Sequence, residues 1–283
     1  MTNHIYRVTA FSDSVDGGNL AGVVLDADSL SEEQMLGIAK EVGYSETAFV
    51  MKSTKADFNV RFFTPTDEVD LCGHATIATF NLLRDLGIIK VGDYTQETKA
   101  GILELQVLDH YVYMEQNAPK FYEIMDKKEI AGCFDSHQRD YIGDMPIQIV
   151  STGLKDIILQ VKDLETLLGL RPNLEKINLI SKKHDVVGIH AFCLETLSEV
   201  EAHVRNFAPR YGINEESATG TANAALACYL MKYQKHEFHG DFVIEQGYSM
   251  MRPSKIMVKV RVAGDDTMQV YVGGSAVLIV SHS

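Results

Sequence analysis

Two stretches of this chain, residues 70–87 and residues 216–232, each contain a polar turn ending in glycine that leads directly into a small-residue, apolar helix. Both contain the pattern Gly-x-Ala-x-x-Ala, which begins at Gly73 in the first stretch and at Gly220 in the second. The first N–H groups of a helix have no partner within it, so such a turn is suited to binding an anion. The repeat therefore predicts two similar halves, each with one Gly-led turn, and a cleft built from both.

The second of these helices has almost no polar face. Residues 222–231 read ANAALACYLM, with Asn223 as the one clearly polar side chain. A helix that is apolar all round must be buried on all sides, so several strands must wrap around it. The pattern predicts an α+β fold of two similar domains, each a curved, mostly antiparallel sheet around a central helix, rather than a doubly wound parallel sheet.

The order of elements predicts an internal duplication. Each half reads strand, helix, strand, Gly-led turn, apolar helix and further strands. The first helix of the N-terminal half opens with the capping-box pattern of residues 31–34 and stops at Gly43. Residues 116–122, which include Pro119, read as a linker. We therefore expect domains at residues 1–118 and 119–283. The last strand, residues 276–280, could stay in the second domain or return to the first.

Composition excludes several classes of function. The net charge is −13 and no long Lys/Arg run occurs, which argues against a nucleic-acid partner. No apolar run reaches the roughly 18–20 residues that a membrane span needs, and no signal peptide is recognisable, so a cytoplasmic protein is expected. The cysteines are far apart, without a CxxC pair, and read as free thiols: Cys72, Cys133, Cys193 and Cys228.

Three residues are candidates for chemistry. Glu46 stands at the entrance to a strand, where most glutamates are merely solvated. His74 lies in the first Gly-led turn, where it could equally cap or pack, and Glu216 precedes the second, where it could cap the helix electrostatically. The position of His74 and Glu216 beside matched turns favours function. The tight pair His236 and His239 has nothing nearby to complete a metal-ligand set.

Four blocks of the sequence resemble the phenazine-biosynthesis-like PhzF family. They are SETAFV, RFFTPTDEVDLCGHATIAT, FAPRYGINEESATGTANAALACYL and IEQGYSMMRPSKIMVKV, in the family's order. The resemblance implies the diaminopimelate-epimerase-like fold, with the active site between two domains. It also implies a homodimer, and an isomerase that works without metal or organic cofactor. The characterised member acts on a dihydro-hydroxyanthranilate, but the resemblance does not identify the substrate of this chain.

The resemblance also assigns residues. Glu46 matches the family's catalytic glutamate, and His74 the histidine of its Gly-His-Ala-Thr turn. Where the family usually reads Glu-Asp-Pro-x-Thr-Gly-Ser, residues 215–221 have Glu216 for the aspartate, Ser217 for the proline and Thr221 for the serine. These changes keep a carboxylate and a hydroxyl but alter the geometry on the second-turn side of the expected active site. The substrate-binding residues expected are Asn19, Ser45, Gly73, Gly220 and Thr221.

The predicted chemistry is proton transfer on a small carboxylate-bearing metabolite, including cyclic ones. Glu46 would take a proton from carbon and return it elsewhere on the same molecule. The N–H groups of the two turns would hold the substrate carboxylate and the developing anion. His74 and Glu216 would form a second acid/base pair or fix the polar groups of the substrate.

Two alternatives stay open. Proline racemases also carry a Cys-Gly-His turn, so Cys72 could serve a cysteine-assisted racemase or epimerase of an amino or imino acid. The second turn has no cysteine to supply an opposing thiol, which disfavours a two-thiol mechanism. A non-catalytic protein that binds small carboxylates is the other alternative, and the changes at Glu216 and Ser217 leave room for it.

Overall fold

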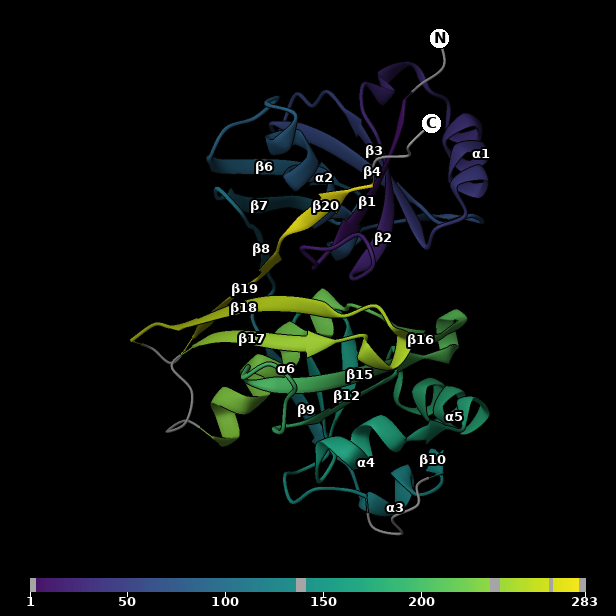
Figure 1. Ribbon diagram of the computed structural model, residues 1–283, viewed down its shortest axis with the longest axis vertical. Helices are drawn as coiled ribbons and strands as arrows, with labels where there is room; N and C mark the ends of the chain where they lie inside the picture. The colour runs from purple at the N-terminus through teal and green to yellow at the C-terminus, as the bar shows by residue number, and fades with distance from the viewer. Residues whose placement is uncertain (1–3, 136–140, 235–239, 265–266, 280–283) are drawn as a thin grey trace. The chain divides into compact units, whose positions relative to one another are not determined.

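The chain divides into two compact units, described here from a computed structural model of residues 4–135, 141–234, 240–264 and 267–279 (Figure 1). Unit 1 comprises Met1–Glu115 and Gly273–Ser283, and unit 2 comprises Gln116–Val272. The first crossing from unit 1 to unit 2 thus falls between Glu115 and Gln116, compared with the boundary after residue 118 expected from the sequence. Unit 2 is inserted before the last strand of unit 1.

Unit 1 is a sheet around one central helix. The helix, α2 (Gly73–Asp85), is buried at every residue from His74 to Leu83 and contacts five strands. Buried residues of those strands, mostly in consecutive runs, supply the surface that covers it. The strands of unit 1 are β1 (Ile5–Ala10), β2 (Asn19–Val24), β3 (Glu46–Met51), β4 (Phe58–Phe63), β5 (Glu68–Val69), β6 (Gly92–Thr98), β7 (Gly101–Val107), β8 (Val112–Gln116) and β20 (Ala276–Leu278), of which β8 ends one residue inside unit 2.

Unit 2 repeats this design around α6 (Gly220–Tyr233). Gly220 and every residue from Ala222 to Leu230 are buried, as the all-apolar pattern predicted. The helix contacts β11, β12 and β18. The strands of unit 2 are β9 (Lys120–Ile124), β10 (Phe134–Asp135), β11 (Gln148–Ser151), β12 (Lys155–Gln160), β13 (Arg171–Pro172), β14 (Ile189–Cys193), β15 (Ala202–Ala208), β16 (Ile213–Glu216), β17 (Asp241–Gln246), β18 (Ser254–Val262) and β19 (Met268–Gly274), which runs on into unit 1.

Strand pairing confirms the internal duplication and the α+β fold class. Most neighbouring strands are antiparallel, but each unit has two parallel pairs at matched places. In unit 1 these are β2–β3 and β4–β6, and in unit 2 they are β12–β14 and β15–β17. In each unit the second parallel pair flanks the central helix in the chain. The last strand, β20, pairs antiparallel with β1 in unit 1.

The remaining helices are amphipathic and cover the outer faces. In unit 1, α1 (Glu32–Val42) begins with the capping box of Ser31 and Gln34 and ends at Gly43 in the left-handed conformation, as predicted. In unit 2, buried residues of α3 (Lys127–Ile130), α4 (Leu164–Gly169) and α5 (Leu174–His184) share one apolar cluster with β12, β14 and β15.

The interpretation of residues 116–122 as a linker was wrong in part. Residues from Lys120 onward form β9, which pairs antiparallel with β11 of unit 2. The sequence hid this strand because its side chains are mostly exposed and include Lys120 and Glu123, which leaves no apolar alternation to read. The short helices α3 and α4 were missed as well, since four and six residues are too few to show a helical period.

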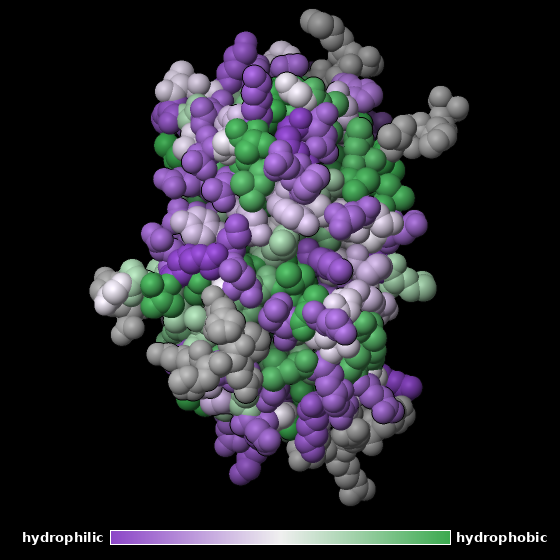
Figure 2. All heavy atoms as spheres, turned by 60° about the vertical axis from the view of Figure 1, so that its left-hand side comes forward, coloured by the Kyte–Doolittle hydropathy of each residue, from purple (hydrophilic) through white to green (hydrophobic). Residues whose placement is uncertain are grey.

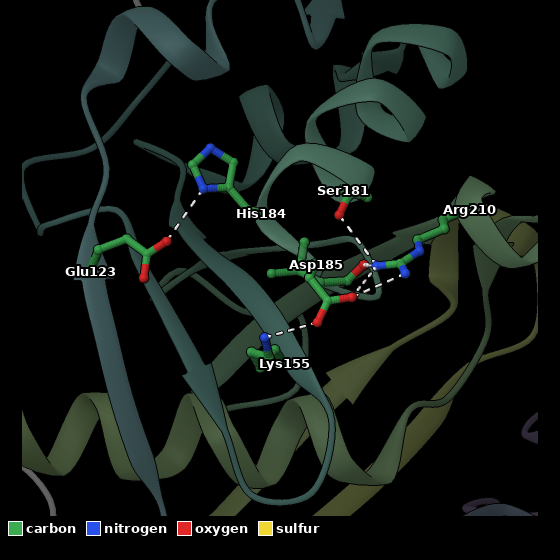
Figure 3. A network of polar contacts seen from close by, with 7 residues as sticks. Glu123, Lys155, Ser181, His184, Asp185 and Arg210 are labelled. Atoms are coloured by element: carbon green, nitrogen blue, oxygen red, sulfur yellow. Dashed lines mark hydrogen bonds and ion pairs between the residues drawn. The ribbon is translucent and has the colours of Figure 1, made fainter.

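An ion-pair network fixes the C-terminal end of α5 (Figure 3). The Arg210 guanidinium donates to the backbone carbonyls of Ser181 and Val186 and to the carboxylate of Asp185, which sits in the left-handed conformation at the helix end. Lys155 lies 3.2 Å from the other side of Asp185. Arg210 thereby connects the Ser181 carbonyl in the last turn of α5 to Asp185 and Val186 beyond the helix end.

The surface is mixed in character. On the face drawn in Figure 2, hydrophilic and hydrophobic residues are interspersed. No described helix combines the length and the apolar composition that crossing a membrane requires.

All four cysteines are buried free thiols, as predicted, with Cys193 and Cys228 fully buried.

Candidate active site

The two Gly-led turns differ from the other helix starts of the described residues. The helices α1, α3, α4 and α5 each begin with a side chain that accepts a hydrogen bond from a first-turn N–H group. The residues at the same place in α2 and α6, Cys72 and Thr219, make no such bond. Among the described α-helices, the turns predicted from the repeat are therefore those whose N–H groups no capping side chain occupies, as an anion site requires.

The first turn brings together the predicted carboxylate and imidazole of unit 1. Glu46 begins β3, and His74 lies in the first turn of α2. Oε2 of Glu46 is 3.3 Å from Nε2 of His74, and their side chains are 18% and 6% exposed. Ser45 Oγ lies 3.4 Å from the same nitrogen. A carboxylate this close to an imidazole in a largely buried setting is suited to proton transfer.

Cys72 is the fourth member of this cluster. Its sulfur is 3.3 Å from Nδ1 and 3.9 Å from Nε2 of His74, and Nε2 is also 3.3 Å from Oε2 of Glu46. Ligand atoms of Glu46, Cys72 and His74 all lie within 4.8 Å of one another. Thiolate, imidazole and carboxylate are ligands that Zn²⁺ accepts, so these three residues could hold such an ion.

Asn19 lies in the same unit. It begins β2, whose Ala21 is the register partner of Glu46 in the parallel pair β2–β3. Asn19 is two positions from Ala21, so it shares a strand face with it near the Glu46 end of the pair. The preceding Gly18 has φ +69°, and a Cβ there would meet the carbonyl oxygen of Ala10 at 2.3 Å. The glycine is thus required for the chain to enter β2 at Asn19.

The second turn is held by hydrogen bonds among three polar residues of unit 2. Thr219 Oγ1 donates to Oε2 of Glu216 at 2.9 Å. The amide of Gln246 donates to the carbonyl of Glu216 at 2.7 Å and to Thr219 Oγ1 at 3.1 Å, while its oxygen accepts from the Thr219 N–H. Thr152 Oγ1 donates to the carbonyl of Thr221 at 3.1 Å. Glu216 is therefore fixed in place at the end of β16.

The turn also depends on Gly247. Its φ is +82°, and a Cβ there would lie 2.2 Å from the carbonyl oxygen of Arg252 and 2.6 Å from that of Ser217. Ser217 itself is buried. The residue that follows Gln246 must therefore be glycine for the strand to pass this close to the turn.

The structure adds residues that sequence reasoning gave no role. Asp156, His190, Asn206, Asn223 and Gln246 are all buried in unit 2. Burial and the charge of Glu216 raise the pKa of Asp156 to about 8, and burial lowers the pKa of His190 to about 4. The sequence feature that could have pointed to this group is Asp156 itself, an acid directly before the apolar residues 157–159.

The predicted site residues thus fall into two groups. In unit 1, Ser45, Glu46 and His74 are in contact around Cys72. In unit 2, Glu216 contacts Thr219, the residue that immediately precedes Gly220 and Thr221. The pair His236 and His239 lies outside the described residues.

The chain is similar to known proteins along nearly its whole length. A family model described as "Phenazine biosynthesis-like protein" matches residues 8–282. The chain is 34% identical to the uncharacterized isomerase YfhB of Bacillus subtilis over 281 residues, covering 96% of this chain and 95% of that protein. It is 35% identical to the PhzF-family protein of Bacillus anthracis, whose crystal structure gives a TM-score of 0.91 and covers 99% and 98% of the two chains.

More distant structures share the fold alone. The hydroxyproline epimerase of Agrobacterium vitis, solved with bound trans-4-hydroxy-L-proline, is 14% identical with a TM-score of 0.63, over 98% of this chain and 90% of that one. The fold is therefore common to PhzF-family proteins and to this epimerase, including the two-domain arrangement.

Proposed function

This chain belongs to the PhzC-PhzF family of phenazine biosynthesis-like proteins, and we propose that it is an isomerase that moves a proton on a small carboxylate-bearing metabolite without a cofactor. Its relatives are named isomerases, and its fold is shared with an epimerase. From the family resemblance we further propose that the protein is cytoplasmic and that it forms a homodimer. A solution mass of twice 31.5 kDa would establish the dimer.

The observation that carries this proposal is the contact between Glu46 and His74 beside a helix start that has no capping side chain. A base and a second proton-transfer group lie 3.3 Å apart, next to N–H groups suited to a carboxylate. A merely structural carboxylate at a helix start would be expected to accept those N–H groups itself, as Asp126 and Asp163 do.

In the proposed reaction, the Glu46 carboxylate removes a proton from a carbon next to an unsaturated or carboxyl-bearing carbon. The electron pair of the broken C–H bond spreads into the conjugated system of the substrate, and Glu46 returns the proton at another carbon. N–H groups at the start of α2 stabilise the negative charge that develops, and oxyanion holes suggest about 3–4 kcal/mol for each well-placed donor. His74 donates or accepts a proton at a polar group of the substrate.

Unit 2 has a carboxylate of its own, Glu216, which we propose binds substrate or transfers a proton at the second Gly-led turn. Glu216 is oriented by Thr219, and the hydroxyl of Thr221 stands at the start of α6 where the family has a serine. Glu216 is one methylene longer than the family's aspartate. We therefore propose that the substrate differs in shape from that of family members with the shorter acid.

A second candidate function rests on the 3.3 Å contact between Cys72 and His74. An imidazole beside a thiol favours the thiolate, which can remove a proton from the α-carbon of an amino or imino acid. In that reaction Cys72 would replace Glu46 as the base, and the product would be the epimer of the substrate. The two candidates therefore differ in which residue is indispensable.

Deuterium uptake from D₂O into a panel of small cyclic and amino-acid carboxylates, followed by NMR, tests the proposal. Exchange at carbon that is lost in Glu46→Gln and kept in Glu104→Gln would support it. Glu104 is an exposed strand residue of the same unit and controls for loss of an acid elsewhere. Saturable binding of a carboxylate without exchange in wild type would overturn it in favour of a binding protein.

A further inference from the structure

A chain of buried polar side chains runs across unit 2 behind its Gly-led turn. His190 Nε2 lies 3.2 Å from Oδ1 of Asn223, and its Nδ1 lies 3.1 Å from the amide of Asn206. The Asn223 amide donates to Gln246 Oε1 at 2.8 Å. None of these four side chains is more than 1% exposed. Since buried polar groups are costly unless bonded, each member fixes the position of the next.

Both acids of this region adjoin Asn206. In the antiparallel pair β15–β16, Asn206 is the register partner of Glu216, and in β14–β15 it is the partner of His190. Side chains of register partners share a face, with Cβ atoms about 4.5–5.5 Å apart. Asp156 shares a face of β12 with Ile158, the register partner of His190. Asp156 and Glu216 thus approach Asn206 from different strands.

Asp156 forms no ion pair among the described residues. Its side chain is 2% exposed, and its Oδ1 has no hydrogen-bond partner among the described residues. Hydrogen bonds from the Asn206 side chain and the Gly188 backbone favour its ionised form, but burial and the charge of Glu216 outweigh them and raise the pKa of Asp156 to about 8. Asp156 is therefore protonated at neutral pH.

Charged residues that adjoin this group along its own strands belong to the opposite face of the sheet. Positions along a strand alternate between faces, so residues adjacent in sequence to Asp156, Asn206, Glu216 and Gln246 point away from this group. They are Lys155, Arg205, Glu215 and Glu245, and His203, two residues before Arg205, shares its face. Arg205 pairs with Glu215 at 2.8 Å, and His203 with Glu245 at 2.7 Å. On the inner face, burial lowers the pKa of His190 to about 4, so it is neutral and adds no cation.

We propose that Asp156 is a positioning residue for the second Gly-led turn: while protonated, it leaves Glu216 as the single negative charge there, and its ionisation at alkaline pH disables the turn. This rests on the proposed role of Glu216 in binding or proton transfer. A second negative charge beside Glu216, near the N-terminus of α6, repels a substrate carboxylate and holds the Glu216 proton more tightly. The effect falls on the apparent KM for an anionic substrate.

Carboxyl ¹³C NMR of aspartate-labelled protein tests the coupling without any substrate. Wild type, Asp156→Asn, Glu216→Gln and the control Asp144→Asn, an exposed acid of unit 2, are titrated from pH 4 to 10. We expect one signal with a midpoint near pH 8 that is absent only from Asp156→Asn and that moves to lower pH in Glu216→Gln. A wild-type Asp156 signal that titrates near pH 4, or one unmoved by Glu216→Gln, would overturn the proposal.

Two arrangements keep the test decisive. If Asp156→Asn does not fold, the signal that moves between wild type and Glu216→Gln still identifies the coupled acid, and the absence of any such signal counts against the proposal. With a substrate from the exchange panel, wild-type kcat/KM should fall about tenfold per pH unit above the midpoint, because KM rises. The pH profile of Asp156→Asn should lack this alkaline decrease. The same alkaline decrease of kcat/KM in wild type and in Asp156→Asn would refute the positioning role of Asp156. Absence of exchange in wild type refutes the proposed function alone, because the NMR result does not depend on it.

Discussion

The thiol of Cys72 lies 3.3 Å from Nδ1 and 3.9 Å from Nε2 of His74, and the Glu46 carboxylate lies 3.3 Å from the same Nε2. Two groups that could each act as a carbon base thus adjoin one imidazole. Which of them does so separates a carboxylate isomerase from a cysteine-assisted epimerase.

Replacing the two bases separately should distinguish these mechanisms. We expect Glu46→Gln to reduce proton exchange by about 10²–10⁴-fold, the usual contribution of a general base, and Cys72→Ala to change it only a few-fold. The measurement is deuterium incorporation at saturating substrate, with Cys133→Ala, a buried thiol of unit 2, as the control. The opposite ranking of the two variants would establish the thiol mechanism.

Zn²⁺ should bind to the Glu46, Cys72 and His74 cluster and inhibit the enzyme. His74 Nε2 lies 3.3 Å from Glu46 Oε2 and 3.9 Å from Cys72 Sγ. Tetrahedral zinc with bonds of about 2.0–2.3 Å separates its ligands by about 3.3–3.6 Å, so only small shifts are needed. Competition with a chromogenic chelator should show one ion per chain. Cys72→Ala should weaken binding by more than about tenfold, the equivalent of 1.4 kcal/mol. Equal affinity in Cys72→Ala and Cys133→Ala would argue against this site.

Stability should fall between about pH 6.5 and 8. Folded Asp156, with a pKa of about 8, keeps a proton that the unfolded chain, with an ordinary value of 3.8, has lost. The free energy of unfolding therefore decreases as pH rises between these values. His190 acts oppositely, because its pKa falls from 6.5 to about 4 on folding, but only below pH 6.5. Urea titrations of wild type should show a loss of roughly 2 kcal/mol over this range, at about 1.4 kcal/mol per pH unit. The same loss in Asp156→Asn would assign it to other groups.

Two glycines of α1 should respond oppositely to alanine. Gly37 is an exposed helix-interior residue with open space at its Cβ, so Gly37→Ala should stabilise unit 1 by about 0.5–1 kcal/mol. Gly43 has equally open space but a φ of +69° at the helix end, so Gly43→Ala should destabilise it by about 1–2 kcal/mol. Denaturant midpoints of the two variants measure the difference. Shifts in the same direction would mean that backbone conformation does not control this helix end.

Local patterns were sufficient for the elements that organise the fold. The apolar run of α6 could only be a helix surrounded by strands, and the capping box of α1 is written in four consecutive residues. The partner of β20 was not predictable, because its pairing with β1 joins opposite ends of the chain and leaves no local signal. β9 was hidden for another reason, since pairing at its backbone needs no apolar side chains.

The site could be predicted less completely. Glu46 and His74 were identified by resemblance, and their positions on β3 and α2 gave no indication that they are 3.3 Å apart. Asp156 escaped notice because an acid in a strand is normally assumed to face water. Its burial follows from the wrapping of β12 around α6, a tertiary effect that no window of sequence contains.

The pairing of β20 with β1 has a consequence for the order in which the molecule can be made. Ribosomes deliver the chain from its N-terminus, and domains generally fold as they emerge. The sheet of unit 1 acquires β20 only after all of Gln116–Val272 has been synthesised. The half that is begun first is thus the half that is completed last. During translation the edge of β1 that later pairs with β20 is unpaired, so a chaperone or a second nascent chain could bind to it.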